Sequence, residues 1–231
     1  MAAVARLGQL ARHFTLSANS SGRTAVRAMA TAANGTHGIG RLAPNETALL
    51  VCDVQERFRP VISGFPAVVD TSRRMLRAAQ ALQLPVIVTE QYPKALGNTV
   101  EELREFIPAD APVVAKTKFS MCTDEVNAAL DKLGSGVRKV LIVGIETHVC
   151  VLQTTLDLLE RGYEVHILVD GVSSQRLGDR SVALQRLAQS GAFLATSEMV
   201  MFQMMVNTAH PAFKAVSAIC KEERPEQLPA H

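Results

Sequence analysis

The sequence predicts an α/β fold, namely a Rossmann-like, doubly wound, mainly parallel six-stranded sheet with helices on both faces. From residue 47 onward, short apolar runs alternate with longer segments in which apolar residues recur every three or four positions. The short runs are apolar at successive positions, as expected of strands that are covered on both faces. With 231 residues and 48% hydrophobic content, the chain is long enough for one domain with a sizeable core.

The elements can be assigned in chain order. Six apolar runs, mostly rich in Val, Ile and Leu, predict strands at residues 48–52, 86–89, 112–115, 140–143, 165–169 and 193–195. The clearest helix between them has one apolar face at helical spacing, made by Val68, Val69, Met75, Leu76, Ala79 and Leu82. A second helix is predicted over residues 149–160, ended by Gly162, with one stripe made by Leu152, Leu156 and Leu159.

We expect a leader of residues 1–40, a single domain of residues 45–215 and a C-terminal tail of residues 216–231. The segment before Glu46 is rich in Ala, Ser and Thr, contains no acidic residue and carries Arg6, Arg12, Arg23, Arg27 and Arg41. This composition is typical of an organelle transit peptide, and a disordered tail is the alternative. Import into the mitochondrion is the expected outcome. A plastid, or the cytoplasm if translation starts at Met29, are the alternatives.

Charge, hydropathy and cysteine spacing limit the classes of partner. The net charge is only +2, and much of the excess comes from the N-terminal segment, so nucleic acid is not an expected partner. No run reaches the roughly 18 apolar residues of a membrane span, so no membrane partner is expected. The four cysteines, Cys52, Cys122, Cys150 and Cys220, lack Cys-x-x-Cys spacing and are predicted to be reduced thiols.

Three chemically complementary side chains follow predicted strands. Asp53 follows the first strand, Lys116 the third, and Cys150 lies in the turn after the fourth, close to a helix start. In a doubly wound sheet, ligands bind outside the carboxyl ends of the strands, so these groups are expected on one rim. A helix N-terminus favours the thiolate form of a cysteine, which makes Cys150 a candidate nucleophile.

Each of these residues also has a purely structural interpretation. Asp53 could cap a turn, Lys116 could be a solvated strand end, and Cys150 could be a small buried hydrophobe. A non-catalytic interaction module that keeps the fold would need none of the three. A dinucleotide oxidoreductase is disfavoured because bulky residues, not Gly-x-Gly-x-x-Gly, follow the first strand.

Three segments in order give a more specific indication. The sequence reads Asp53-Val-Gln-Glu-Arg-Phe58, Lys116-Thr-Lys-Phe-Ser120 and Gly144-Ile-Glu-Thr-His-Val-Cys-Val151. Together they resemble the isochorismatase-like cysteine hydrolase family over about residues 45–210. Thr89-Glu-Gln-Tyr-Pro93 further resembles the branch of isochorismatase domain-containing proteins, most of all those numbered 2.

The resemblance implies a catalytic triad of Asp53, Lys116 and Cys150. Lys118 is a rival for the lysine role, and Lys116 is preferred because it directly ends an apolar run and stands four residues before Ser120. The family pattern also implies a cis peptide at Ile145–Glu146 and an oxyanion hole made by the backbone N–H groups of Glu146 and Cys150. These groups suit a cysteine hydrolase that cleaves a small amide-like carbon–nitrogen bond through a thioester.

The remaining expectations concern the pocket, cofactors and assembly. Residues that follow strand ends or flank the triad are expected to form a small, partly aromatic substrate pocket: Gln55, Phe58, Gln91, Tyr92, Phe119 and Thr147. Nicotinamidases of this family bind a metal through an Asp-x-His arrangement and further histidines between the first two strands. No histidine lies between Asp53 and Lys116, so the resemblance implies neither that metal nor another cofactor here. His148 is expected to border the pocket rather than act as a base, because residues separated by two positions in a helix point apart. With two tyrosines, eight phenylalanines and no tryptophan, the chain is expected to bind a small-molecule substrate. The Met-rich stretch of residues 199–205 favours a subunit contact, so we also expect a homo-oligomer, either a dimer or a tetramer.

Overall fold

The computed structural model describes residues 38–229. The leader predicted over residues 1–40 therefore lies almost wholly outside the described residues. Within the described residues there are six strands: β1 (Thr47–Cys52), β2 (Val86–Gln91), β3 (Val113–Lys116), β4 (Lys139–Ile145), β5 (Glu164–Ser173) and β6 (Phe193–Ala195). They form one parallel sheet in the order β3-β2-β1-β4-β5-β6. This order confirms the predicted doubly wound, Rossmann-like fold.

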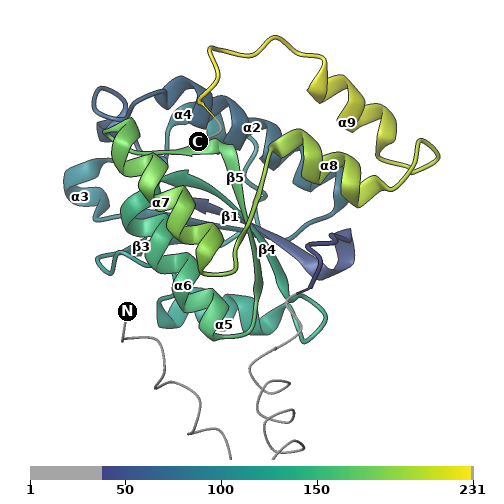
Figure 1. Cartoon of the computed structure of the whole chain (residues 1–231), viewed down its shortest axis with the longest axis horizontal. Helices are drawn as coiled ribbons and strands as arrows, with labels where there is room; N and C mark the ends of the chain where they lie inside the picture. Colours follow the sequence, from purple (N-terminus) through teal and green to yellow (C-terminus); the bar gives the residue numbers. More distant parts are fainter. Residues whose placement is uncertain (1–37, 230–231) are drawn as a thin grey trace, which may run out of the picture. The chain divides into compact units, whose positions relative to one another are not determined.

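Helices cover both faces of the sheet (Figure 1). One face packs against α2 (Phe65–Leu82), α4 (Glu101–Arg104), α8 (Ser197–Met205) and α9 (Phe213–Cys220). The other face packs against α5 (Asp124–Lys132), α6 (Leu152–Glu160) and α7 (Leu177–Gln189). The short elements are α3 (Pro93–Leu96), η1 (Pro44–Glu46), η2 (Glu56–Phe58) and η3 (Thr147–Val151).

Alternation along the central strand explains the two layers of core. In β1, Leu49 and Val51 belong to the cluster under α2, whereas Leu50 and Cys52 belong to the cluster under α6. Successive side chains of a strand point to opposite faces, so a strand that is apolar at every position is buried on both sides. No helix within residues 38–229 is long and apolar enough to cross a membrane.

The structure differs from the sequence expectations at two helices. The helix predicted over residues 149–160 is divided into η3, a π-helical turn, and α6, which begins at Leu152. Thr154 Oγ1 donates to the carbonyl of Cys150, and Thr155 Oγ1 donates to that of Val151 at 2.8 Å. Single π-helical turns often occur at functional sites.

The predicted start of a C-terminal tail, residue 216, falls inside α9. The segment after α9 is bound to the core by arginine side chains. Arg74 of α2 donates to the carbonyls of Ile219, Glu222 and Glu223, which satisfies carbonyl groups at the end of α9. Arg224 donates to Asp170 at 3.0 Å, so this segment packs as part of the domain.

Candidate active site

The sheet order brings the three predicted catalytic residues to one edge. β1 and β4 are neighbours at the point where the strand order reverses, which is where this kind of sheet binds ligands. Asp53 follows β1, and Cys150 lies in η3, just after β4. Lys116 ends β3, and its side chain reaches past β2, so that Nζ lies 2.7 Å from Asp53 Oδ2.

Asp53 is fixed by several contacts. Its backbone has a φ of 54°, in the left-handed region that few non-glycine residues adopt. Its amide donates to the carbonyl of Thr89 at 3.1 Å, and Thr89 Oγ1 donates to Oδ1 at 2.8 Å. Both carboxylate oxygens therefore have partners, and the side chain of Asp53 is only 1% exposed.

The Lys116 ammonium is fully buried and surrounded by acceptors. Besides Asp53, Nζ contacts Gln91 Oε1 at 2.7 Å, the carbonyl of Phe119 at 2.9 Å and that of Lys118 at 3.2 Å. Burial alone would lower the pKa of Lys116, but electrostatic interactions with Cys52, Asp53 and Cys150 raise it by a larger amount, so the pKa lies above its usual value. Lys116 therefore stays charged at neutral pH.

Cys150 lies beside this ion pair at the edge of the core. The residue is 7% exposed and belongs to the hydrophobic cluster under α6. It lies close enough to Lys116 to contribute to the raised pKa of the ammonium. The turn that carries it follows a cis peptide at Ile145–Glu146, in agreement with the sequence expectation.

Gly144 permits the close approach of β4 to β1 just before this turn. Its φ is 119°, and a Cβ atom at this position would lie 2.0 Å from the carbonyl oxygen of Cys52. Only glycine tolerates both conditions.

Cys52 is a neighbour that the sequence did not single out. Its Sγ lies 3.4 Å from the carbonyl oxygen of Ile145 and 3.6 Å from Asp53 Oδ2. Burial, a hydrogen bond with Cys150 and the charge of Asp53 raise the pKa of the Cys52 thiol well above its usual value. The available signal was its position, since the last residue of β1 directly precedes Asp53.

Two glutamines of the predicted pocket fix the lysine rather than form an open wall. Gln91 accepts from Lys116, and its own amide group donates to the carbonyl of Thr117 at 2.9 Å. Gln55 is fully buried and exchanges hydrogen bonds with the backbone of Gln91, at 2.7 Å and 3.0 Å. Gln55 thus holds Gln91, which holds Lys116.

The other predicted pocket residues lie in different environments. Tyr92 and Phe119 are 51% and 52% exposed and flank the residues that bind Lys116. Thr147 is buried in η3, and its hydroxyl has no hydrogen-bond partner within residues 38–229. Phe58 packs against the hydrophobic cluster under α2, on the other face of the sheet from Cys150.

The side chains of Lys118 and His148 bind partners other than Asp53 and Lys116. Lys118 Nζ binds Asp157 at 2.8 Å, and its side chain is 53% exposed. His148 Nδ1 is 2.9 Å from Ser174 Oγ. The Glu146 side chain accepts from the backbone of Gln175 at 2.8 Å. Of the two candidate lysines, Lys116 is therefore the one that contacts Asp53.

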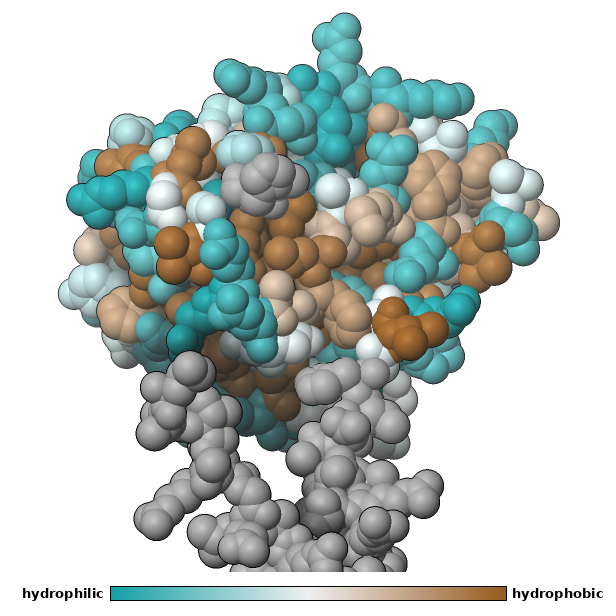
Figure 2. Space-filling view, viewed as in Figure 1, coloured by the Kyte–Doolittle hydropathy of each residue, from teal (hydrophilic) through white to brown (hydrophobic). Residues whose placement is uncertain are grey.

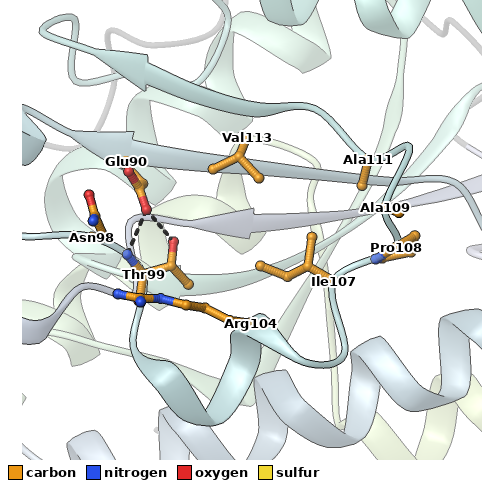
Figure 3. Close-up of a pocket in the computed structure, with 9 residues that line it drawn as sticks. All are labelled: Glu90, Asn98, Thr99, Arg104, Ile107, Pro108, Ala109, Ala111 and Val113. Atoms are coloured by element: carbon orange, nitrogen blue, oxygen red, sulfur yellow. Dashed lines mark hydrogen bonds between the residues drawn. The ribbon is translucent and has the colours of Figure 1, made fainter.

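A cavity of about 460 Å³ opens on the side of β2 opposite to Gln91 and Lys116 (Figure 3). Glu90 and Gln91 are consecutive, so their side chains point to opposite faces of the strand. Glu90 lines the cavity and accepts from the amide and hydroxyl of Thr99, at 2.6 Å and 2.8 Å. The other lining residues are Asn98, Arg104, Ile107, Pro108, Ala109, Ala111 and Val113. This cavity contains none of the triad residues, and residues 38–229 hold no cluster of three or more potential metal ligands.

The fold and the residues at the carboxyl edge of its sheet are those of one family of α/β proteins. Residues 47–199 match the model of the isochorismatase domain, and the chain belongs to the isochorismatase family. This membership supports a hydrolase and confirms the resemblance found in the sequence.

The chain is similar to isochorismatase domain-containing protein 1 of Salmo salar, with 47% identity over 81% of the chain and 65% of that protein. It thus spans about two thirds of the length of that relative. It is also similar to isochorismatase domain-containing protein 2 of Xenopus laevis, with 46% identity over 81% of the chain and 90% of that protein. These identities do not separate the two numbered groups.

Among solved structures, the chain is similar to one named MAR1 ribonuclease from Caenorhabditis elegans. The identity is 46%, the TM-score is 0.78, and the match covers 82% of this chain and 98% of that one. The YcaC gene product of Escherichia coli, described as an octameric hydrolase of unknown specificity, has a TM-score of 0.71 at 22% identity, covering 79% and 91% of the two chains. That likeness shows the fold alone.

Proposed function

We propose that the protein is a cysteine-dependent hydrolase that cleaves a small amide-like carbon–nitrogen bond, with Asp53, Lys116 and Cys150 as its catalytic triad. The observation that carries the proposal is the fully buried Lys116–Asp53 pair, 2.7 Å apart, next to the Cys150 thiol at the carboxyl edge of the sheet. Burying two charges is costly and seldom increases stability, so such a pair beside a thiol favours a catalytic role.

In the proposed reaction, Asp53 accepts the proton of Cys150 as a general base. The positive charge of Lys116 stabilises the resulting thiolate. The thiolate forms a C–S bond to the carbonyl carbon, and the carbonyl electron pair moves to oxygen. The backbone N–H groups of Glu146 and Cys150 stabilise this oxyanion, each contributing roughly 10²–10³ in rate.

The tetrahedral intermediate then collapses. The C–N bond breaks, and the leaving amine takes the proton held by Asp53. Water, deprotonated by Asp53, attacks the thioester and releases the carboxylic acid and the Cys150 thiolate. The thiolate regains its proton from Asp53, so the residues return to their starting state.

A small substrate fits the narrow access to the thiol. Cys150 is almost buried, while the rings of Tyr92 and Phe119 are exposed beside the residues that hold Lys116. We propose that these rings border the entrance and that Thr147 lines its inner wall. The proposed reaction uses only side chains, backbone N–H groups and water, and it requires no cofactor.

RNA is the second substrate class to test, because a similar structure is named a ribonuclease. Charge argues against it. Four of the 24 Lys and Arg residues lie in residues 1–37, which hold no Asp or Glu, so the rest of the chain has 20 basic and 22 acidic residues. Binding to nucleic-acid phosphates relies on basic side chains, and this part of the chain has no net excess of them.

The test is a screen of small amides, ureides and carbamoyl compounds for ammonia or amine release, with an RNA oligonucleotide as a separate substrate. Cys150→Ala should lower hydrolysis by at least about 10³-fold, because the nucleophile is lost. Cys122→Ala, at another buried cysteine, should leave it unchanged. Wild-type protein that turns over no member of the screen would favour the alternative of an interaction module. RNA cleavage that survives Cys150→Ala would contradict the triad.

We also propose a homo-oligomer. The described part of the chain exposes Met199, Phe202 and Val206 at or just after α8, and Figure 2 shows apolar surface over α8 and α9. The Escherichia coli relative is described as an octamer, which is a larger assembly than the dimer or tetramer expected from the sequence. Light scattering of the full chain, compared with Phe202→Asp/Val206→Asp, tests this. A monomeric wild type would contradict it.

A further inference from the structure

Cys52 is a buried thiol that the proposed hydrolysis does not use. It ends β1 and is 0% exposed. Its sulfur lies 3.4 Å from the carbonyl oxygen of Ile145, in the chain segment that leads into the Cys150 turn. It also lies 3.6 Å from Asp53 Oδ2. Cys52 therefore sits beneath the same turn that presents the nucleophile.

The two thiols are direct neighbours. Cys52 and Cys150 belong to one hydrophobic cluster, and the Cys52 sulfur lies 3.4 Å from the Ile145 carbonyl oxygen at the start of the turn that carries Cys150. Cys150 is also close enough to help raise the pKa of the Cys52 thiol. Both sulfurs also interact with the charge of Lys116. The other two cysteines have different surroundings, since Cys122 neighbours Ser120 and Asp157, and Cys220 ends α9.

The two thiols differ in character. Burial and the neighbouring Asp53 charge keep the Cys52 thiol protonated, because both raise its pKa. Cys150 is 7% exposed whereas Cys52 is 0% exposed, so Cys150 is the member of the pair nearer to solvent. Redox-sensitive cysteines often lie next to a second, resolving thiol in this way.

We propose that Cys150 and Cys52 form a peroxide-oxidation site, in which Cys150 is oxidised and Cys52 captures it as an intramolecular disulfide. The proposal rests on the proposed function only for the thiolate character of Cys150. It goes beyond that function because it assigns Cys52 a role and adds a second reaction to the site.

The reaction balances with hydrogen peroxide as the oxidant. The Cys150 thiolate attacks one peroxide oxygen, the O–O bond breaks, and Cys150 becomes a sulfenic acid while hydroxide leaves. The Cys52 sulfur then attacks the Cys150 sulfur and displaces its hydroxyl group. The Cys52 proton passes to Asp53 and from there to the departing hydroxyl group, which leaves as water. Two thiols are oxidised by two electrons, and one peroxide is reduced.

The disulfide has two consequences for the protein. It removes the nucleophile, so hydrolysis stops until a thiol reductant restores Cys150. It also protects Cys150 from further oxidation to the sulfinic and sulfonic acids, which thiols do not reverse.

The experiment treats the full-length protein with hydrogen peroxide, blocks free thiols and identifies peptides by mass spectrometry without reductant. Wild type should yield a cross-link between the peptides that contain Cys52 and Cys150, and dithiothreitol should remove it. Cys52→Ser and Cys52→Ala should instead accumulate sulfinic and sulfonic acid at Cys150. Cys122→Ser and Cys220→Ser should form the cross-link as wild type does.

Each outcome decides the proposal. Wild-type Cys150 that becomes overoxidised as fast as in the Cys52 variants, or that is not oxidised, overturns it. The cross-link is detected by mass and needs no substrate, so it stands or falls separately from amide hydrolysis. Loss of amidase activity in Cys150→Ala with no disulfide in wild type would refute the oxidation site alone.

Discussion

Replacing Lys116 with methionine tests the buried ion pair directly. The side chains of Lys116 and Asp53 are 0% and 1% exposed. Methionine keeps most of the apolar length but removes the charge, so Lys116→Met leaves the Asp53 carboxylate buried without its cation. Breaking a buried pair in this way costs about 3–5 kcal/mol.

This cost is large compared with the usual stability of a domain, roughly 5–15 kcal/mol. For a domain of this size each kcal/mol shifts Tm by roughly 2–4 °C, so the melting temperature should fall by roughly 6–20 °C. The assay is urea unfolding of wild type and variant, supported by a thermal melt.

Two further variants make the result specific. Lys118→Met breaks the ion pair between Lys118 and Asp157, whose side chains are 53% and 36% exposed. Loss of this exposed pair should lower the free energy of unfolding by less than about 1 kcal/mol. The double variant Asp53→Asn/Lys116→Met removes both charges and should be more stable than Lys116→Met alone. If Lys116→Met lowers the free energy of unfolding by no more than Lys118→Met does, Lys116 and Asp53 do not form a buried, coupled pair.

Three other changes have defined outcomes. Gly144→Ala should cost more than about 3 kcal/mol in urea unfolding, since its Cβ would lie 2.0 Å from the Cys52 carbonyl oxygen at a φ of 119°. The control Gly134→Ala has a φ of 82° but no neighbour within 4 Å and should cost about 1 kcal/mol, and equal costs would contradict the steric argument. Burial is the main cause that lowers the pKa of His166 from 6.5. Below pH 6.5 this imidazole therefore becomes protonated in the unfolded chain while it stays neutral in the folded protein. The free energy of unfolding should therefore decrease as pH falls below 6.5, and less so in His166→Gln; equal slopes would speak against this assignment. Finally, residues 1–40 fused to a fluorescent protein should direct it to mitochondria while a chain starting at Met29 stays cytosolic, and diffuse fluorescence of the first fusion would contradict a mitochondrial transit peptide.

The sheet was predictable because its strands are apolar at nearly every position. All six strands overlap their predicted runs, and β6 matches residues 193–195 at both ends. The largest difference is β5, which continues to Ser173 although the apolar run ends at Val169. Asp170 follows, and its carboxylate is satisfied by Ser197 and Arg224 from distant segments, which local sequence does not reveal.

The proximity of Asp53 and Lys116 followed from the rule that parallel strands end at the same edge. The partners that hold them were not predictable in the same way. Gln55 was expected as a pocket wall, yet its amide binds the backbone of Gln91. Cys52 has no motif of its own, and its proximity to Cys150 depends on the geometry of the turn that follows β4. Side-chain direction and turn geometry, rather than strand placement, were therefore the missing information.

The most direct test of the triad is the rate at which iodoacetamide alkylates Cys150 at neutral pH. The reaction is run without urea and at a low temperature at which each variant is folded, and it is followed by peptide mass spectrometry. Cys150 in Lys116→Met should be alkylated at least about tenfold more slowly than in wild type, because a thiol without a neighbouring cation is only a few per cent ionised at pH 7. Lys118→Met should react as wild type does. An unchanged rate in Lys116→Met would contradict the claim that the ammonium of Lys116 activates this cysteine.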